Sequence, residues 1–149
     1  MPTEKLDDID FELVQVTEEK QSLYENLALS TLNDPGFTYF QKRDFLSALK
    51  GHRLTMLALI NKKIAGYYHI DIEDLKNWFG IFIVQHYRGQ GLGKILIQHA
   101  QEFSMQEGIS LELMVYASNT KAINLYKKMN FHITSCDGEK IFMQWTHTR

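Results

Sequence analysis

A run of glycines between an apolar segment and an amphipathic segment is the part of this sequence best suited to chemistry. The segment Arg88-Gly-Gln-Gly-Leu-Gly-Lys94 follows the apolar run Ile81–Val84 and precedes a helical pattern. Glycines let the backbone turn tightly and let a ligand approach without Cβ atoms in the way. The first N–H groups of a helix have no partner within it, and the helix dipole favours an anion there. With Arg88 and Lys94 as flanking positive charges, the pattern predicts a site for a phosphate-bearing ligand.

Two common phosphate-binding glycine motifs match this segment poorly. A dinucleotide-binding loop reads Gly-x-Gly-x-x-Gly after a first strand, whereas here Gly89, Gly91 and Gly93 alternate after the fourth predicted strand. A Walker A loop needs a hydroxyl residue after Gly-Lys, but Ile95 follows Lys94. The remaining alternatives are a module that binds another nucleotide and a strand-to-helix turn that binds no ligand.

A second pattern further along the chain identifies a family. The segment Asn119-Thr-Lys-Ala-Ile-Asn-Leu-Tyr-Lys-Lys-Met-Asn-Phe131 resembles the Asn-x-x-Ala-x-x-Leu-Tyr-x-x-x-Gly-Phe signature of the GNAT acetyltransferases. The segment Arg88–Gly93 is similar to the Arg/Gln-x-x-Gly-x-Gly/Ala pyrophosphate loop of the same family. Either motif alone is moderately specific, but both occur here in the family's order, and the resemblance runs best from Ile64 to Phe131. It implies an N-acetyltransferase that moves an acetyl group from acetyl-CoA to a primary amine.

The resemblance also implies which residues hold acetyl-CoA, the expected co-substrate. The strand before the loop is expected to splay from its neighbour and to pair its main chain with the pantetheine arm through Ile81, Phe82 and Ile83. The loop amides are expected to hold the pyrophosphate, while Asn119 hydrogen-bonds the cofactor and Tyr126 lies near its sulfur. The loop residues are Arg88, Gly89, Gln90, Gly91, Leu92, Gly93 and Lys94. No metal is expected.

General chemistry then assigns two catalytic groups. Attack of a neutral amine on the thioester builds negative charge on the carbonyl oxygen, which the main-chain N–H of Ile81 can stabilise. The departing thiolate needs a proton or a strong hydrogen bond, and Tyr126 is the candidate donor. The alternative for Tyr126 is a core tyrosine on an amphipathic helix.

The base that deprotonates the amine has several candidates. Some family members that acetylate protein N-termini carry a Glu on the strand before the Asn, at the position of Met114 here. Glu112 lies two residues earlier and points to the same side of the strand, so it is a candidate base or a solvated strand residue. His69, Asp71 and Glu73 are further candidates, although a histidine on an apolar hairpin is more often structural. Water can also relay the proton.

Two departures from the family pattern bear on the function. Asn130 stands where the family has Gly before Phe131, and because Asn tolerates a left-handed backbone we expect the same helix C-cap. Met114 in place of Glu weakens the option of a protein N-terminus as acceptor. We expect a small-molecule amine such as an amino sugar, polyamine, amino acid or aminoglycoside. The alternatives are a protein N-terminus or lysine, or a non-catalytic domain that binds coenzyme A.

Hydrophobic periodicity predicts the elements that position these residues. The predicted fold is a mixed α/β GNAT fold, with about seven strands in a mostly antiparallel sheet that is splayed between strands 4 and 5 and flanked by about four helices. The predicted strands are 11–16, 54–60, 64–70, 78–84, 111–116, 131–134 and 141–145. The predicted helices are 18–30, with Thr17 as N-cap, 39–50, 91–107 and 120–129.

Length and composition limit the number of domains, the class of protein and its partners. The 149 residues fit a single domain, 1–149, and 44% hydrophobic with 23% charged residues is typical of a globular protein. A net charge of -2 argues against a nucleic-acid partner. One cysteine, Cys136, cannot form an internal disulfide and is too few for a Cys-rich zinc site. Because the sequence shows neither a signal peptide nor a membrane span, we expect a cytoplasmic protein without a membrane partner, with a homodimer as a further expectation.

Overall fold

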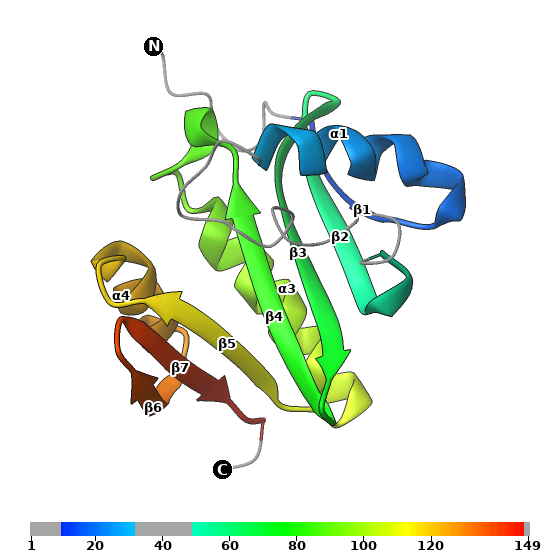
Figure 1. Cartoon of the computed structure of the whole chain (residues 1–149). Helices are drawn as coiled ribbons and strands as arrows, with labels where there is room; N and C mark the ends of the chain where they lie inside the picture. Colours follow the sequence, from blue (N-terminus) through cyan, green and yellow to red (C-terminus); the bar gives the residue numbers. More distant parts are fainter. Residues whose placement is uncertain (1–9, 32–48, 148–149) are drawn as a thin grey trace.

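The computed structural model describes residues 10–31 and 49–147, and its centre is a seven-stranded sheet in the order β1-β2-β3-β4-β5-β7-β6 (Figure 1). The strands are β1 (Phe11–Gln15), β2 (His52–Ile60), β3 (Lys63–Glu73), β4 (Lys76–Ile83), β5 (Leu111–Tyr116), β6 (His132–Asp137) and β7 (Lys140–Trp145). The helices are α1 (Gln21–Thr31), α3 (Leu92–Glu107) and α4 (Thr120–Lys128), with 3₁₀ turns at Glu18–Lys20 and Gln85–Tyr87. The predicted mixed α/β class and the seven strands are confirmed.

Neighbouring strands pair antiparallel everywhere except between β4 and β5, which pair parallel. Helix α1 begins at Gln21, three residues later than predicted. The reason is a tighter 3₁₀ turn at Glu18–Lys20, in which the Lys20 N–H donates to the Thr17 carbonyl over 2.9 Å. The predicted helix at 39–50 lies mostly outside the described residues, although 49–51 are helical.

Two apolar layers, one on each face of the sheet, hold the helices. Helices α3 and α4 share a layer with β5 through Leu96, Ile123 and Leu113, all of which are buried. Helix α1 covers the opposite face, where Leu27 packs with Tyr67 of β3 and Phe82 of β4. In Figure 1, α1 accordingly crosses in front of the sheet and α3 runs behind it. Because side chains alternate along a strand, β3 and β4 present one set of residues to each layer.

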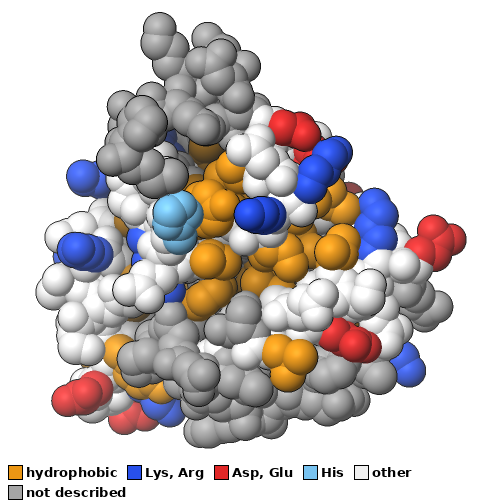
Figure 2. Space-filling view, turned by 90° about the horizontal axis from the view of Figure 1, so that it is seen from above, with side chains coloured by type: hydrophobic (Ala, Val, Ile, Leu, Met, Phe, Trp, Pro, Cys, Tyr) orange, Lys and Arg blue, Asp and Glu red, His pale blue; other side chains and the backbone are white. Residues whose placement is uncertain are grey.

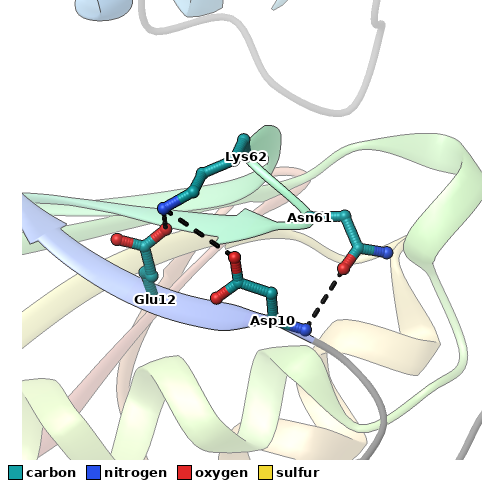
Figure 3. A network of polar contacts seen from close by, with 4 residues as sticks. All are labelled: Asp10, Glu12, Asn61 and Lys62. Carbon is teal, nitrogen blue, oxygen red and sulfur yellow. Dashed lines mark hydrogen bonds and ion pairs between the residues drawn. The ribbon is translucent and has the colours of Figure 1, made fainter.

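The β2–β3 hairpin and the start of β1 are tied together at one end of the sheet (Figure 3). Asn61 and Lys62 form the turn with positive φ values of 51° and 68°. The Lys62 Nζ lies 2.8 Å from the Glu12 Oε1 and 3.8 Å from the Asp10 Oδ2, and Glu12 raises the pKa of this exposed amine. The Asp10 N–H donates to the Asn61 Oδ1 over 3.1 Å. These contacts stabilise the β1 edge of the sheet, which is separated from β5 by the strands β2, β3 and β4.

Candidate functional site

The pairing between β4 and β5 ends almost as soon as it begins. Their register holds one residue pair, Trp78 with Glu112, within the described part of the chain. Beyond it the two strands diverge toward their carboxyl ends (Figure 1). The predicted splay between the fourth and fifth strands is therefore present, and among residues 10–31 and 49–147 no strand pairs with this edge of β4 after its first residues.

The pairing of β4 with β3 determines which main-chain groups face this opening. The Val84 N–H donates to the Ala65 carbonyl over 2.8 Å, so Val84 directs its main chain toward β3. In an antiparallel ladder this direction alternates from residue to residue. Phe82 therefore also faces β3, while Ile81 and Ile83 direct their N–H and C=O groups toward the opening. Three residues of this strand were predicted to pair with a ligand. The register directs the main-chain groups of two of them, Ile81 and Ile83, toward the opening.

The glycine loop joins β4 to the start of α3 in a conformation that requires glycine. Gly89 and Gly91 have φ values of 76° and 85°, and no heavy atom lies within 4 Å of a Cβ placed at either position. Gly91 is the N-cap of α3, so no side chain caps this end of the helix. The Ile95 N–H donates to the Gly91 carbonyl over 3.3 Å, which leaves the amides of Leu92, Gly93 and Lys94 ahead of the helical ladder. An open loop with uncapped amides is a suitable anion site.

Arg88 folds back onto β4. Its Nε donates to the Ile83 carbonyl over 2.8 Å, and its guanidinium carbon lies 5.4 Å from the centre of the Phe82 ring. The Arg88 charge is thereby fixed beside the loop and at the end of the opening. Gln90 is held to the preceding turn by an Nε2 bond to the His86 carbonyl over 3.1 Å, and the Lys94 side chain is exposed. Neither contact of Arg88 was predicted, because both depend on how the chain turns after β4.

Gly93 brings the two sequence motifs into contact. A Cβ at Gly93 would lie 3.1 Å from the Cδ2 of Leu125 on α4, so glycine here allows α4 to pack closely on the start of α3. Tyr126, the next residue, is buried in the same apolar layer. The loop and the second motif are therefore neighbours in space although they are far apart in the sequence.

Both ends of α4 are fixed by its own motif. Asn119 is the N-cap, and its Oδ1 accepts a bond from the Ala122 N–H over 3.2 Å. At the other end the Phe131 N–H donates to the Tyr126 carbonyl over 3.0 Å and the Asn130 N–H to the Lys127 carbonyl over 3.1 Å, the Schellman pattern. Asn130 has a φ of 70°, so the predicted left-handed cap is confirmed. The capping role of Asn119 was missed, although Asn just before a helix is a signal for it.

This cap also fixes the side chain of Tyr126. The C-cap folds Phe131 back so that its ring centre lies 5.7 Å from that of Tyr126. Burial raises the pKa of Tyr126 to about 12. The hydroxyl therefore keeps its proton at neutral pH and can act only as a neutral donor or acceptor.

Glu112 lies at the closed end of the opening. It is the β5 partner of Trp78 and the neighbour of Gln144 on β7. Its Oε2 accepts a bond from the Gln144 Nε2 over 2.9 Å. Paired residues point to the same face, so Glu112 shares the α1 face of the sheet with Trp78 and Phe82.

The surface at the carboxyl end of β4 has an apolar centre and a charged rim. Figure 2 looks down on this end of the molecule and shows hydrophobic side chains at the centre, with Lys, Arg and His side chains and several Asp and Glu side chains around them. A separate cavity of about 420 Å³ lies at the other end of the sheet, beside the end of β1 and the start of β2. Among residues 10–31 and 49–147, no cluster of three metal-ligating side chains occurs, and no helix is long and apolar enough to cross a membrane.

Comparison with protein families gives a match over most of the chain. The family described as "Acetyltransferase (GNAT) family" matches residues 14–131. A curated relative, the peptidyl-lysine N-acetyltransferase YjaB of Salmonella typhimurium, is 41% identical over 54 residues. That match covers 36% of this chain and about a third (34%) of the relative.

Solved structures share the fold at low sequence identity. The GNAT-family acetyltransferase of Streptococcus pneumoniae superposes with a TM-score of 0.76 at 21% identity, covering 92% of this chain and 99% of that one. The yncA protein of Salmonella typhimurium, solved with its cofactor acetyl-CoA, superposes with a TM-score of 0.73 at 13% identity, covering 94% and 95%.

The glycine loop gives a matched pair of variants. We expect Gly91→Val to weaken acetyl-CoA binding at least about tenfold, because a β-branched residue at a φ of 85° forces the loop to move. Gly138→Val, in the β6–β7 turn at a φ of 60° and also in open space, is the control. Both variants should lose thermal stability, but only Gly91→Val should lose affinity in isothermal calorimetry. Equal affinity in the two variants would mean that the loop does not hold the ligand.

Proposed function

The chain belongs to the acetyltransferase (GNAT) family, and on that premise we propose that it transfers the acetyl group of acetyl-CoA to a primary amine of a small molecule. One observation carries the proposal: the edge of β4 that no other described strand pairs with runs directly into a helix N-terminus that no side chain caps. An extended ligand with an anionic end fits such a site, because strand main-chain groups pair with its arm and loop amides with its phosphates.

The residues predicted from the sequence then receive specific tasks. The main chain of Ile81 and Ile83 pairs with the pantetheine arm, while Phe82 supports the strand from the α1 face. The amides of Gly89, Gln90, Gly91, Leu92, Gly93 and Lys94 hold the pyrophosphate, with the positive charges of Arg88 and Lys94 beside them. Asn119 keeps its Oδ1 in the cap of α4 and offers its amide N–H groups to the ligand. The solved yncA protein with acetyl-CoA supports this choice of ligand.

Acetyl-CoA supplies an activated acyl group, and the protein supplies the polar groups around it. The N–H of Ile81 is the first amide directed at the opening beyond the β4–β5 pair. We therefore assign this N–H the role of hydrogen-bond donor to the carbonyl oxygen of the thioester. A donor at that position is worth about 10²–10³-fold in turnover when charge develops on the oxygen. Being part of a strand, the N–H is held in place before the reaction begins.

Tyr126 acts on the leaving sulfur as a hydrogen-bond donor. Burial raises the pKa of Tyr126 to about 12, well above that of an ordinary thiol, about 8.5. Complete transfer of the phenol proton to a thiolate is therefore unfavourable. A donated hydrogen bond stabilises the thiolate without that cost, and the proton that finally reaches the sulfur comes from the amine.

Glu112 is the carboxylate nearest to the opening on β5. Its partner Trp78 lies three residues before Ile81, or roughly 10 Å along the strand. At that separation Glu112 attracts the incoming ammonium and acts as the base only through water.

A second acceptor class, the lysine side chain of a peptide, has one observation in its favour. The YjaB relative, named a peptidyl-lysine N-acetyltransferase, is 41% identical over the 54 residues that match. Both acceptor classes present a primary amine to the same opening, so the chemistry above applies to either.

The proposed function is tested by ligand-induced stabilisation followed by turnover. Acetyl-CoA at a hundredfold excess over its Kd should stabilise the protein by about 2.7 kcal/mol, while ATP and NAD should have no effect. Thiol release is then measured with polyamines, amino sugars, aminoglycosides and amino acids, and with lysine peptides as the second class. Stabilisation by ATP or NAD instead would assign the loop to another nucleotide. Stabilisation by acetyl-CoA without release from any amine would indicate a non-catalytic domain.

Tyr126→Phe tests the role of the hydroxyl. We expect turnover to fall at least about tenfold while acetyl-CoA affinity stays nearly unchanged, because the ring and its packing on Phe131 remain. Tyr116→Phe, on the neighbouring strand β5 and half-buried, is the matched control and should keep its turnover. Unchanged turnover in Tyr126→Phe would leave the tyrosine with only a packing role.

A further inference from the structure

On the α1 face of the sheet, β5 and β7 have no helix over them among residues 10–31 and 49–147 (Figure 1). Leu27 of α1 packs with residues of β2, β3 and β4, whereas α3 and α4 lie on the opposite face. The side chains on this uncovered area alternate with buried residues of the same strands. They are Trp78 of β4, Glu112 and Met114 of β5, and Phe142 and Gln144 of β7, here called the β5 platform.

Two aromatic rings of the β5 platform meet across β5. The ring centres of Trp78 and Phe142 are 6.2 Å apart and the planes lie 72° from parallel, an edge-to-face contact. The contact spans β5, which lies between the two strands that carry the rings. Both residues are half-buried, so part of each ring faces solvent. The pair is therefore an apolar wall that a ligand can reach.

A cation already lies beside the Trp78 ring. The Lys76 Nζ is 6.0 Å from the ring centre. An ammonium within about 6 Å of an indole is attracted by the negative face of the ring. Lys76 is exposed and its charge sits on a flexible stem, so another ammonium can replace it. Lys76 thus occupies the position of a cation that the ring can bind.

Glu112 adds a negative charge next to the same ring. It is the cross-strand partner of Trp78, and its Oε2 accepts a hydrogen bond from the Gln144 Nε2 over 2.9 Å. Within the described part of the chain, its Oε1 has no partner. On the other side of Trp78 the cross-strand partner is Asp71, a second carboxylate. An ammonium at this end of the β5 platform would bind the open Glu112 oxygen with the indole beside it.

An exposed methionine connects this charged end with the opening between β4 and β5. Met114 follows Glu112 by two residues, about 7 Å along β5. The residue is 37% exposed, an unusually high value for a large apolar side chain in a central strand. A thioether is an adaptable apolar surface. Methylene groups can therefore lie on Met114 where a charged group would find no partner.

The β4 side of the same path is filled. A Cβ at Gly80 would lie 2.4 Å from the His69 Cε1, so the imidazole occupies the space over this glycine. The imidazole is held by a hydrogen bond with Tyr67 and by stacking on His52, with ring centres 4.3 Å apart. A ligand that crosses the β5 platform must therefore lie on the β5 side, over Met114.

Spacing along β4 sets the length of chain that fits. Trp78 lies three residues, or roughly 10 Å, before Ile81, whose N–H we assign to the thioester oxygen. An extended polypeptide advances about 3.3–3.6 Å for every three bonds, so a chain of about nine bonds covers this distance. An aliphatic chain of this length can hold one amine at each end of the path.

We propose that the acceptor is a linear aliphatic polyamine. Its far ammonium binds between Trp78 and Glu112, its methylenes lie on Met114, and its near amine attacks the thioester beside Ile81. An amino acid fits this site poorly, because the Glu112 charge repels its carboxylate. An acetylated end is neutral and cannot replace the ammonium at Glu112, so the ligand is acetylated once. This assignment rests on the proposed acetyl transfer and names its acceptor.

Three probes tested on the wild type separate charge from length. In 1,8-diaminooctane nine bonds join the two nitrogens, 8-aminooctan-1-ol has the same length with a neutral end, and 1,4-diaminobutane is shorter. We expect kcat/KM for 1,8-diaminooctane to exceed both other values at least about tenfold, with a singly acetylated product in mass spectrometry. Equal values for the diamine and the amino alcohol would overturn the assignment while acetyl transfer stands.

Glu112→Gln removes the charge and keeps an acceptor for Gln144. We expect the ratio of kcat/KM for 1,8-diaminooctane to that for 8-aminooctan-1-ol to fall to about one. The ratio cancels any part that Glu112 plays in moving the proton, because both probes need that step. Glu102→Gln, an exposed position of α3 on the opposite face, is the control and should keep the ratio. An unchanged ratio in Glu112→Gln would refute the site.

Two further variants test the ring. Trp78→Leu should lower the same ratio, because the indole no longer attracts the far ammonium. Lys76→Gln should raise it, because the competing cation is gone. A ratio that Lys76→Gln lowers would mean that the lysine does not compete with the ligand, against the proposal.

The two tryptophans of the chain report binding without turnover. Trp78 lies on the β5 platform, whereas Trp145 is 6% exposed in the layer on the α3 side. With coenzyme A present, 1,8-diaminooctane should shift the indole N–H signal of Trp78 saturably and leave that of Trp145 in place. A shift of Trp78 in a wild type that releases no thiol with any amine would refute the acetyl transfer and retain the site. Turnover of the diamine without that shift would refute the site alone.

Discussion

The early end of the pairing between β4 and β5 is the constraint on which the rest of the site depends. A strand that loses its neighbour leaves main-chain donors and acceptors that need other partners. Here the register with β3 directs Ile81 and Ile83 toward that edge, and Arg88 already binds the Ile83 carbonyl. In our account the remaining groups pair with a ligand arm. The sheet thus holds these main-chain donors and acceptors in fixed positions before a ligand binds.

Close packing at glycines brings the other parts of the site to this edge. Gly93 admits Leu125, so α4 and Tyr126 lie beside the loop, and Gly80 admits the His69 ring from the opposite face. The two faces consequently present different chemistry to one point on β4. In our proposal, helices α3 and α4 supply uncapped amides and a protonated phenol, while the α1 face supplies the Glu112 carboxylate. This division suits a reaction in which two substrates meet.

Local signals predicted the parts of the fold that depend on neighbours in sequence. The bounds of β5 follow from a short apolar run, and the left-handed Asn130 from the turn that must end α4. The glycine loop was recognisable for the same reason. The cluster of His52, Tyr67 and His69 was not predicted, because three residues on two strands meet only through the register. Gly80 gave a usable signal, since a glycine inside a strand pattern indicates a close neighbour.

The position at which acetyl-CoA perturbs the main chain tests the proposed site most directly. In a titration followed by amide ¹H–¹⁵N correlation spectra, we expect the largest shifts at Ile81 and at the loop amides from Gly89 to Lys94. Residues that line the cavity beside β1, such as Val16 and Leu54, should change little. Saturable shifts confined to the cavity, with the loop amides unmoved, would contradict the assignment of the ligand to the opening between β4 and β5.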